Sequence, residues 1–307
     1  MKTSLSEIPA ESKTLDLNIF YTSPVVCYLS TRASMANYLE NISYDKFVWY
    51  SRPFEFKYQG KNGEIRTGIG GGEQTIEAFH NLGYTVYHGN TAGMFGIASM
   101  MRYETPDDNY IFFKTQKEAF EFVKKLISAD VPISIQIMGD VHPDFHLITG
   151  YNETHVFIPP YKDLKTGKYI APIFENPISF TEEPATSKEL QVLTKEQFFN
   201  IWGSTYNFFT WFEKTHEKKT DEEMFEINKQ DAIKAAENSI KFAKNPIMGS
   251  YTSDGDGAIY TMAASRYLKK HGYTELAEKY VEIAMAYKNK KSYSEIAKLY
   301  EEAAKLW

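Results

Sequence analysis

The chain has 307 residues, with 34 lysines and arginines against 40 aspartates and glutamates, which gives a formal net charge of −6. A mildly acidic chain without a basic block is a poor candidate for binding nucleic acid or an anionic membrane. Apolar residues make up 43% and charged residues 24%, which excludes a disordered or collagen-like chain. Because Cys27 is the single cysteine, an intrachain disulfide and a zinc site made of several cysteines are also excluded.

Two absences from the sequence bear on location. Nowhere do about 18 apolar residues follow one another, which is the length that a membrane-spanning helix needs. The N-terminal residues lack the apolar core of a secretory signal peptide. We therefore expect a protein without a membrane span, located in the cytoplasm. The sequence does not indicate its oligomeric state.

The first predicted helix follows Cys27. Apolar residues from Leu29 to Ile42 recur at helical spacing, which places Cys27 at or near the helix N-terminus. Residues 47–58 alternate loosely between apolar and polar and favour a strand or a loop. A short helix is expected from Glu73 to Gly83, followed by a strand over residues 84–89.

The middle of the chain carries the patterns of further helices and strands. Thr115 and Glu118 form a capping box at the start of a helix that is predicted to end near Ala129. Strands are predicted over residues 131–138, 146–151, 155–158, 169–175 and 207–214, and a capping box of Thr194 and Gln197 starts another helix. A turn at residues 152–154 joins the second and third of these strands into a hairpin.

From Thr220 onward, lysine, glutamate and alanine dominate and the pattern becomes helical, with capping boxes that begin at Thr220 and Ser292. We predict one domain over residues 1–220 and an appended helical subdomain of about four helices over residues 221–307. Two apolar stripes in the second part are similar to helical repeats, but their spacing is too irregular to define a repeat.

Cys27 is the first residue of chemical interest. It follows a largely apolar segment and opens the predicted amphipathic helix. The unpaired N–H groups and the positive dipole end of a helix N-terminus stabilise a thiolate, which is the nucleophilic form of cysteine. An adjacent imidazole would complete the activation. The structural alternative is that Cys27 is a small buried hydrophobic residue, as free cysteines often are.

His146 is the best candidate for that imidazole. It lies at the start of a predicted strand, and the strand before it begins at Asp130-Val131-Pro132-Ile133. The hairpin sequence Gly150-Tyr151-Asn152 follows. A cysteine that opens a helix, a strand with a proline near its start, a histidine strand and a Gly-Tyr hairpin together resemble the papain-like cysteine enzymes.

Within that superfamily the sequence looks closest to the bacteriocin-processing branch, and there to the N-terminal domain of the butirosin-biosynthesis H-type acyltransferases. Four segments carry this narrower resemblance: STRASMANYL shortly after Cys27, FVWYSRPFEFKYQ, GIGGGEQTIEAFHNLGYTVYHG and, in the C-terminal helices, GSYTSDGDGAIYTMAASRYL. The resemblance implies an α+β fold with a papain-like core, in which an N-terminal helix bearing Cys27 packs on an antiparallel sheet bearing His146.

The chain departs from the papain-like pattern at two places. No glutamine lies a few residues before Cys27, where papain-like peptidases use one in the oxyanion hole; the Tyr21 or Thr22 hydroxyl is the candidate replacement. An aspartate or asparagine is also missing where the family orients its imidazole. Asn176 is the preferred candidate for that role and Asp163 the second. For these side chains, an ordinary strand or turn residue is the structural alternative.

Asp140, His142, Asp144 and His146 alternate along the chain, as metal ligands on one face of a strand would. Pro143 interrupts the run, however, the spacing matches no metal motif, and the sequence shows no second cluster of ligands. We therefore expect neither a metal nor another cofactor. His142 is an alternative to His146 as the active base.

The function that the resemblance implies is cysteine-dependent acyl transfer through an acyl-enzyme on Cys27, with His146 moving the proton. The donor would be a small-molecule thioester or amide, including a carrier-protein or coenzyme thioester, and the acceptor an amine or water. One alternative is a papain-like cysteine peptidase or amidase, which the missing glutamine disfavours. The other is a non-catalytic binding protein on an inactivated papain-like scaffold.

Overall fold

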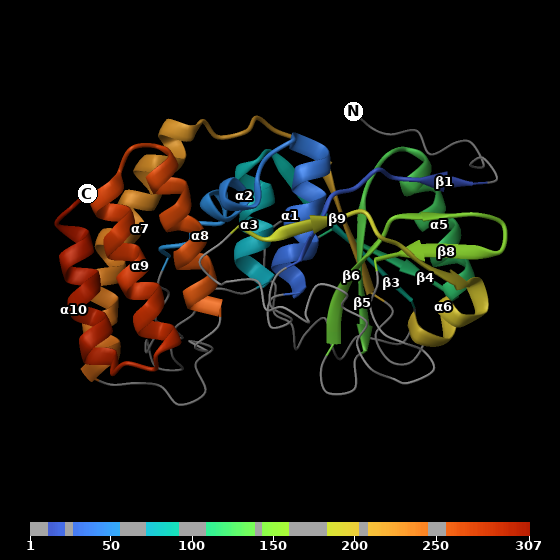
Figure 1. Ribbon diagram of the computed structural model, residues 1–307. Coiled ribbons are helices and arrows are strands. Elements are labelled where there is room, and N and C mark those ends of the chain that lie inside the picture. Colours follow the sequence, from blue (N-terminus) through green and yellow to red (C-terminus); the bar gives the residue numbers. More distant parts are fainter. Residues whose placement is uncertain are drawn as a thin grey trace. The chain divides into compact units, whose positions relative to one another are not determined.

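The computed structural model describes residues 12–21, 27–55, 72–91, 109–138, 143–159, 183–202, 208–244 and 256–307. The chain divides into two compact units, and Figure 1 labels most of the helices and strands of both. Unit 1 comprises residues 1–41, 83–178 and 184–216, and unit 2 comprises residues 42–82, 179–183 and 217–307.

This division differs from the domain boundary predicted at residue 220. The last segment of unit 2 begins close to that point, at Glu217. Unit 2 also includes residues 42–82, however, which the sequence pattern assigned to the first domain. The ring of Trp49 stacks on that of Tyr267, in the C-terminal helices, with centroids 4.6 Å apart. Because such contacts join residues far apart in the chain, no local pattern reveals them.

Among the described residues, unit 1 contains a sheet of five strands in the order β4-β3-β11-β5-β6. The strands are β3 (Tyr84–Thr91), β4 (Asn109–Phe113), β5 (Ile133–Met138), β6 (Pro143–Ile148) and β11 (Phe208–Lys214). Neighbouring strands are antiparallel, except that β3 and β4 run parallel. The fold is therefore α+β as predicted, and the sheet departs from the predicted antiparallel one at a single pair.

Two smaller sheets also belong to the described part of unit 1. Their strands are β1 (Lys13–Thr14), β7 (Gly150–Tyr151), β8 (His155–Ile158) and β10 (Gln191–Thr194) in one sheet, and β2 (Ile19–Tyr21) and β9 (Ala185–Ser187) in the other. The predicted hairpin is present, because β7 and β8 pair with Tyr151 opposite Val156. Asn152 closes the turn, since its Oδ1 accepts from the N–H groups of Thr154 and His155.

Helices cover both faces of the five-stranded sheet (Figure 1). They are α1 (Cys27–Glu40), α5 (Gln116–Ser128) and α6 (Lys195–Trp202). On one face, Phe122 of α5 contacts Phe209 of β11, with ring centroids 6.3 Å apart. On the other, Glu40 at the end of α1 accepts from Tyr84 and Lys214 at 2.7 and 2.6 Å. Phe209 and Lys214 lie an odd number of positions apart on β11, so they mark opposite faces, the α5 face and the α1 face.

Unit 2 is helical in its described part. Its helices are α2 (Tyr44–Tyr50), α3 (Gly72–Asn81), α7 (Asp221–Lys244), α8 (Asp256–Lys270), α9 (Thr274–Lys288) and α10 (Tyr293–Ala304). The last four are the helices predicted after residue 220. Their predicted caps are confirmed: the Thr220 hydroxyl accepts from the N–H of Glu223 at 3.1 Å, and Ser292 forms a capping box with Glu295.

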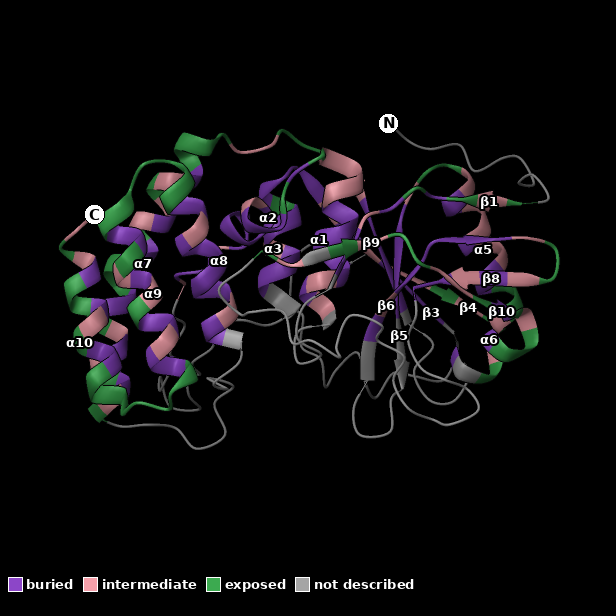
Figure 2. Ribbon diagram, viewed as in Figure 1, coloured by how far each residue is buried: buried purple, intermediate pink, exposed green. Residues whose placement is uncertain are grey.

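The prediction of a strand or loop over residues 47–58 is wrong in the part that α2 occupies. Ser43 starts this helix, because its Oγ accepts from the N–H of Lys46 at 3.2 Å. Residues 47–50 are all buried, Lys46 is the one residue of α2 that is partly exposed, and Figure 2 shows most of α2 coloured as buried. A helix that is buried on nearly every side lacks a continuous polar stripe, so its sequence shows no helical periodicity. Residues 56–58 lie outside the described residues.

The last two helices repeat each other at a spacing of twenty residues. Trp307 donates from Nε1 to the hydroxyl of Tyr280 at 3.0 Å, and the hydroxyls of Tyr287 and Tyr300 lie 3.2 Å apart. Tyr280 corresponds in position to Tyr300, and Tyr287 corresponds to Trp307. Each hydrogen bond therefore joins the first aromatic position of one helix segment to the second aromatic position of the other. This symmetry shows a closer relation between the two segments than the spacing of the apolar stripes indicated.

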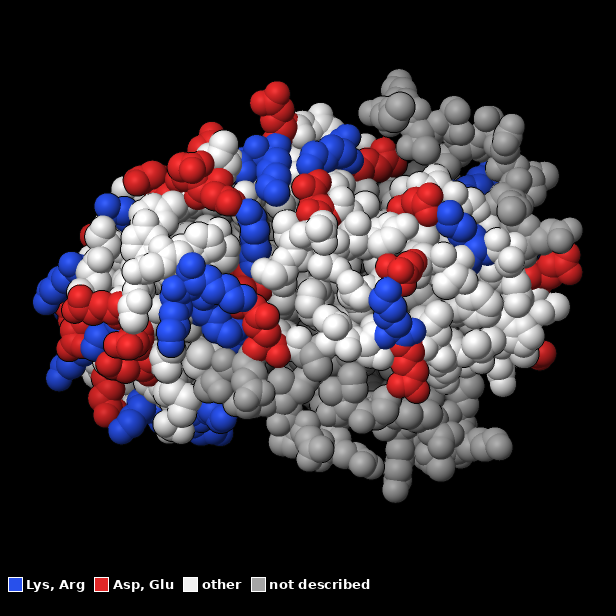
Figure 3. Space-filling model, turned by 45° about the horizontal axis from the view of Figure 1, so that its top comes forward, with Lys and Arg blue, Asp and Glu red and all other residues white. Residues whose placement is uncertain are grey.

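Within the described ranges, no helix combines the length and the apolar character that a membrane span needs. On the face drawn in Figure 3, lysine and arginine side chains lie interspersed with aspartate and glutamate. This mixture agrees with the absence of a basic block from the sequence.

Candidate functional site

The candidate nucleophile is the first residue of α1, which spans Cys27–Glu40. The backbone of Cys27 is helical as predicted, and its side chain lies outside the described part of the structure. The helix is tied to β2, because the N–H of Phe20 donates to Ser34 Oγ at 2.8 Å. The Ser34 hydroxyl in turn donates to the carbonyl of Ser30 at 2.8 Å. The strand that ends at Tyr21, one of the two candidate oxyanion donors, is thereby fixed against α1.

The same helix packs on β6, the strand of the candidate base. The hydroxyl of Thr31 donates to the carbonyl oxygen of Phe145 at 3.0 Å. The rings of Tyr28 and Phe145 meet edge to face, with centroids 6.4 Å apart. Tyr28 directly follows Cys27, and Phe145 directly precedes His146. The fold thus brings the first turn of α1 against the part of β6 that carries His146.

The register of the sheet decides which face His146 takes. His146 lies opposite Ile135 on β5, and Ile135 lies opposite Phe209 on β11. Directly paired residues point to the same face, so His146 projects on the α5 face with Phe209. Phe145 projects on the α1 face, where its ring meets Tyr28. His146 is therefore half-buried on the strand next to α1 but is not aimed at that helix.

Arg32 brings a positive charge into the contact between α1 and β6. Its side chain is fully buried, and the guanidinium carbon lies 5.2 Å from the centroid of the Phe145 ring. A desolvated cation–π pair of this kind contributes roughly 2 kcal/mol. Arg32 follows Cys27 by five residues, or about 1.4 helical turns, so its charge and the helix dipole both favour an anion near the start of α1. Arg32 lies three residues after Leu29 and four before Ala36, which places it on the same helical face as these apolar residues, and this spacing was the sequence signal for it.

His88 is a second histidine that sequence reasoning passed over, although it lies in the strand predicted over residues 84–89. It is only 1% exposed, and its Nδ1 lies 3.0 Å from the hydroxyl of Thr210. Its ring stacks on that of Tyr110, with centroids 5.2 Å apart. His88 projects on the α1 face, but β3 lies three strands away from β6, about 14 Å across the sheet, so His88 is remote from Phe145.

Several predicted site residues cannot be placed in this arrangement. Thr22, Asn176, Asp163, Asp140 and His142 lie outside the described residues, and of Tyr21 only the backbone is described, paired with Ala185 of β9. Among the residues that the structure describes, no three His, Cys, Asp or Glu side chains gather where they could hold a metal ion.

Comparisons with protein-family models, with curated proteins and with solved structures found no match to this chain. The described part offers a cysteine at a helix N-terminus, a buried arginine on the same helix and a histidine on the strand against which that helix packs.

Proposed function

We propose that the protein is a cysteine-dependent acyl-transfer enzyme, with Cys27 as the nucleophile and His146 as the group that moves the proton. One observation carries the proposal: the ring of Tyr28, next to Cys27, packs on the ring of Phe145, next to His146. These two candidate residues are distant in the sequence, so their neighbours meet only because α1 and β6 pack together. The helix N-terminus and the buried charge of Arg32 both favour the thiolate form of Cys27.

In the proposed reaction, the imidazole takes the proton of the Cys27 thiol and the sulfur attacks the carbonyl carbon of the donor. A C–S bond forms, the bond from that carbon to the leaving thiol or amine breaks, and the imidazolium returns its proton to the leaving group. An amine or water then attacks the thioester on Cys27 while the imidazole accepts its proton. Cleavage of the C–S bond releases the product, and the thiolate takes the proton back.

The favoured donors are acyl thioesters of small molecules, including carrier-protein or coenzyme thioesters. A thioester carbonyl is more reactive than an amide, so it depends less on a complete oxyanion hole. The missing glutamine before Cys27 fits such a donor better than a peptide.

One specific observation favours a second candidate, a non-catalytic binding protein on the same scaffold. His146 projects on the α5 face, whereas the contacts to α1 come from Phe145 on the α1 face. An imidazole on the face of the sheet opposite the nucleophile's helix is poorly placed to take the thiol proton. This placement fits a scaffold that binds a ligand without catalysis.

A mass measurement separates the two candidates. The protein is incubated with a panel of short, medium and aromatic acyl thioesters and with unfolded casein, and the intact mass and released peptides are measured. We expect an acyl adduct on the wild type, none on Cys27→Ala and much slower formation on His146→Ala. His155→Ala is the matched control, because His155 is also a half-buried strand histidine but lies on β8.

Casein cleavage that depends on Cys27 would contradict the preference for small-molecule donors and indicate a peptidase. The absence of both adduct and cleavage across the panel would contradict the enzyme proposal and support the binding protein.

A further inference from the structure

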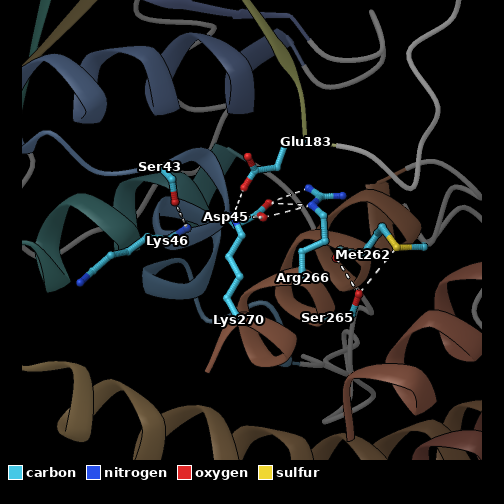
Figure 4. A network of polar contacts seen from close by, with 8 residues as sticks. All are labelled: Ser43, Asp45, Lys46, Glu183, Met262, Ser265, Arg266 and Lys270. Atoms are coloured by element: carbon cyan, nitrogen blue, oxygen red, sulfur yellow. Dashed lines mark hydrogen bonds and ion pairs between the residues drawn. The ribbon is translucent and has the colours of Figure 1, made fainter. Parts of the chain in front are cut away.

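A cluster of four charged side chains joins α2, α8 and the segment before β9 within unit 2 (Figure 4). Asp45 of α2 is fully buried, and its Oδ1 accepts from Arg266 Nε at 3.0 Å and Nη2 at 2.6 Å, while Nε also donates to its Oδ2 at 3.1 Å. Lys270 Nζ lies 3.7 Å from Asp45 Oδ2 and also forms an ion pair with Glu183. One ammonium group thus serves two carboxyl groups, one buried and one with 48% of its side chain exposed.

The other charged residues around α2 are engaged elsewhere or exposed. Among the described residues, the charged groups that face Asp45 are Arg266 and Lys270 of α8 and Glu183. On the other elements packed on α2, Asp221 of α7 binds Lys46, Glu77 of α3 lies 3.7 Å from Arg52, and His80 of α3 is exposed. Within the described part of the chain, the charged groups that set the proton balance of the cluster are therefore its own four members.

The pKa values of the two carboxyl groups move in opposite directions. Burial raises the pKa of Asp45, the hydrogen bonds and charge of Arg266 oppose this, and the hydrogen bond and charge of Glu183 raise it further. The hydrogen bond from Lys270 lowers the pKa of Glu183, and the hydrogen bond with Asp45 acts in the same direction. Opposite shifts are expected where one carboxyl group keeps a proton and donates it to the other.

We propose that Asp45 and Glu183 form a proton-dependent clasp, in which the protonated Asp45 carboxyl donates a hydrogen bond to the Glu183 carboxylate. When that proton is lost, two negative carboxylates face each other across Lys270, and the hold on Glu183 weakens. Glu183 is followed by Pro184 and then by β9. The clasp therefore fixes the chain immediately before that strand, and it does so independently of the proposed acyl transfer.

The direction of the pH dependence follows from linkage. A carboxyl group whose pKa is raised on folding binds its proton more tightly in the folded chain than in the unfolded chain. The stabilisation from Asp45 is therefore fully present below its unfolded pKa of about 3.9 and is lost as the pH rises through the raised folded pKa. Glu183 acts oppositely, because its lowered pKa gives a stabilisation that is lost as the pH falls. The clasp is strongest where Glu183 is ionised and Asp45 is still protonated.

The test combines a carboxyl titration with stability measurements. The side-chain carboxyl carbons of aspartate and glutamate are labelled with ¹³C and titrated by NMR, with Asp45→Asn and Glu183→Gln used to assign the two resonances. We expect Asp45 to titrate above the ordinary aspartate value and Glu183 below the ordinary glutamate value. Because Glu183 is half-exposed, Glu183→Gln should fold, and it should move the Asp45 titration to lower pH.

Urea unfolding between pH 4 and pH 8 measures the consequence. The asparagine of Asp45→Asn keeps a donor toward Glu183 at every pH, so this variant should lose the part of the pH dependence that Asp45 causes. Asp231→Asn is the matched control, because Asp231 is a nearly buried aspartate with two hydrogen bonds from Arg52, and it should keep that pH dependence. The proposal is overturned if Asp45 titrates at or below the ordinary value, or if Glu183→Gln leaves its titration unchanged.

Discussion

The ring planes of Tyr28 and Phe145 are inclined at 81° to each other, so the edge of one ring meets the face of the other. Phe145 also lies under the guanidinium of Arg32, and its carbonyl oxygen accepts from Thr31. Three residues of α1 therefore hold a single residue of β6. Cys27 directly precedes Tyr28, and His146 directly follows Phe145. The packing of Phe145 against α1 should therefore determine how Cys27 and His146 are placed relative to each other.

Phe145→Ala should lower the free energy of unfolding by about 3–5 kcal/mol, because it removes a buried ring and leaves a cavity between α1 and β6. At a pH and temperature where the variant is still folded, Cys27 should also lose its enhanced reactivity toward iodoacetamide. Phe112→Ala is the control, since Phe112 is 55% exposed on β4, and it should change both quantities little. Normal Cys27 reactivity in a folded Phe145→Ala protein would show that this contact does not organise the site.

Cys27→Ala and His146→Ala should be strongly non-additive. If the two residues act as a unit, His146→Ala should slow thioester turnover about 100- to 10,000-fold, and Cys27→Ala should lower the turnover to a residual rate that is at least as slow. The double variant should then be no slower than Cys27→Ala alone. Should His146→Ala leave the rate intact while His142→Ala abolishes it, the active base would be His142.

Gly89→Ala should destabilise unit 1. A Cβ atom at position 89 of β3 would lie 2.1 Å from the ring of Phe209, its partner on β11, so the ring would have to leave its packed position. We expect a loss of about 1–3 kcal/mol in the free energy of unfolding. Gly257→Ala in α8 is the matched control, because the nearest atom, in the ring of Tyr287, would lie 3.8 Å away. An equal effect of the two changes would contradict the close approach at Gly89.

Tyr280→Phe should cost about 0.5–1.5 kcal/mol of stability, because it removes the acceptor for the Nε1–H of Trp307 from the interior of unit 2. Trp307→Phe should cost more, since it removes aromatic area as well as the donor. The double variant should be less destabilised than the sum of the two single changes, because both remove the same hydrogen bond. If the losses in the free energy of unfolding, measured in urea, simply add in the double variant, this hydrogen bond is contradicted.

Local sequence signals predicted the helix ends correctly. Thr115 caps α5 by accepting from the N–H of Glu118 at 3.1 Å, and Gly83, after α3, has the positive φ of 92° that a residue after a helix often takes. These features depend on a few consecutive residues. A capping serine or threonine and its partner three residues later can therefore be recognised without knowing what the helix packs against.

Features that depend on distant residues could not be predicted in the same way. The α2 helix is buried against other elements of unit 2, so the run from Phe47 to Tyr50 carries no polar stripe. The face that His146 takes depends on its pairing with Ile135, and a shift of one residue would turn it to the other face. The residue types pointed to a helix and a strand, whereas the sheet register set the direction of the imidazole.

The pH dependence of iodoacetamide labelling at Cys27 tests the central claim most directly, because this is the only thiol in the chain. The rate is measured by intact mass in the wild type, in His146→Ala and in His155→Ala. The account predicts an apparent thiol pKa below the ordinary value of about 8.5 in the wild type and in His155→Ala, and an altered profile in His146→Ala. An apparent pKa at or above about 8.5 in the wild type would contradict it.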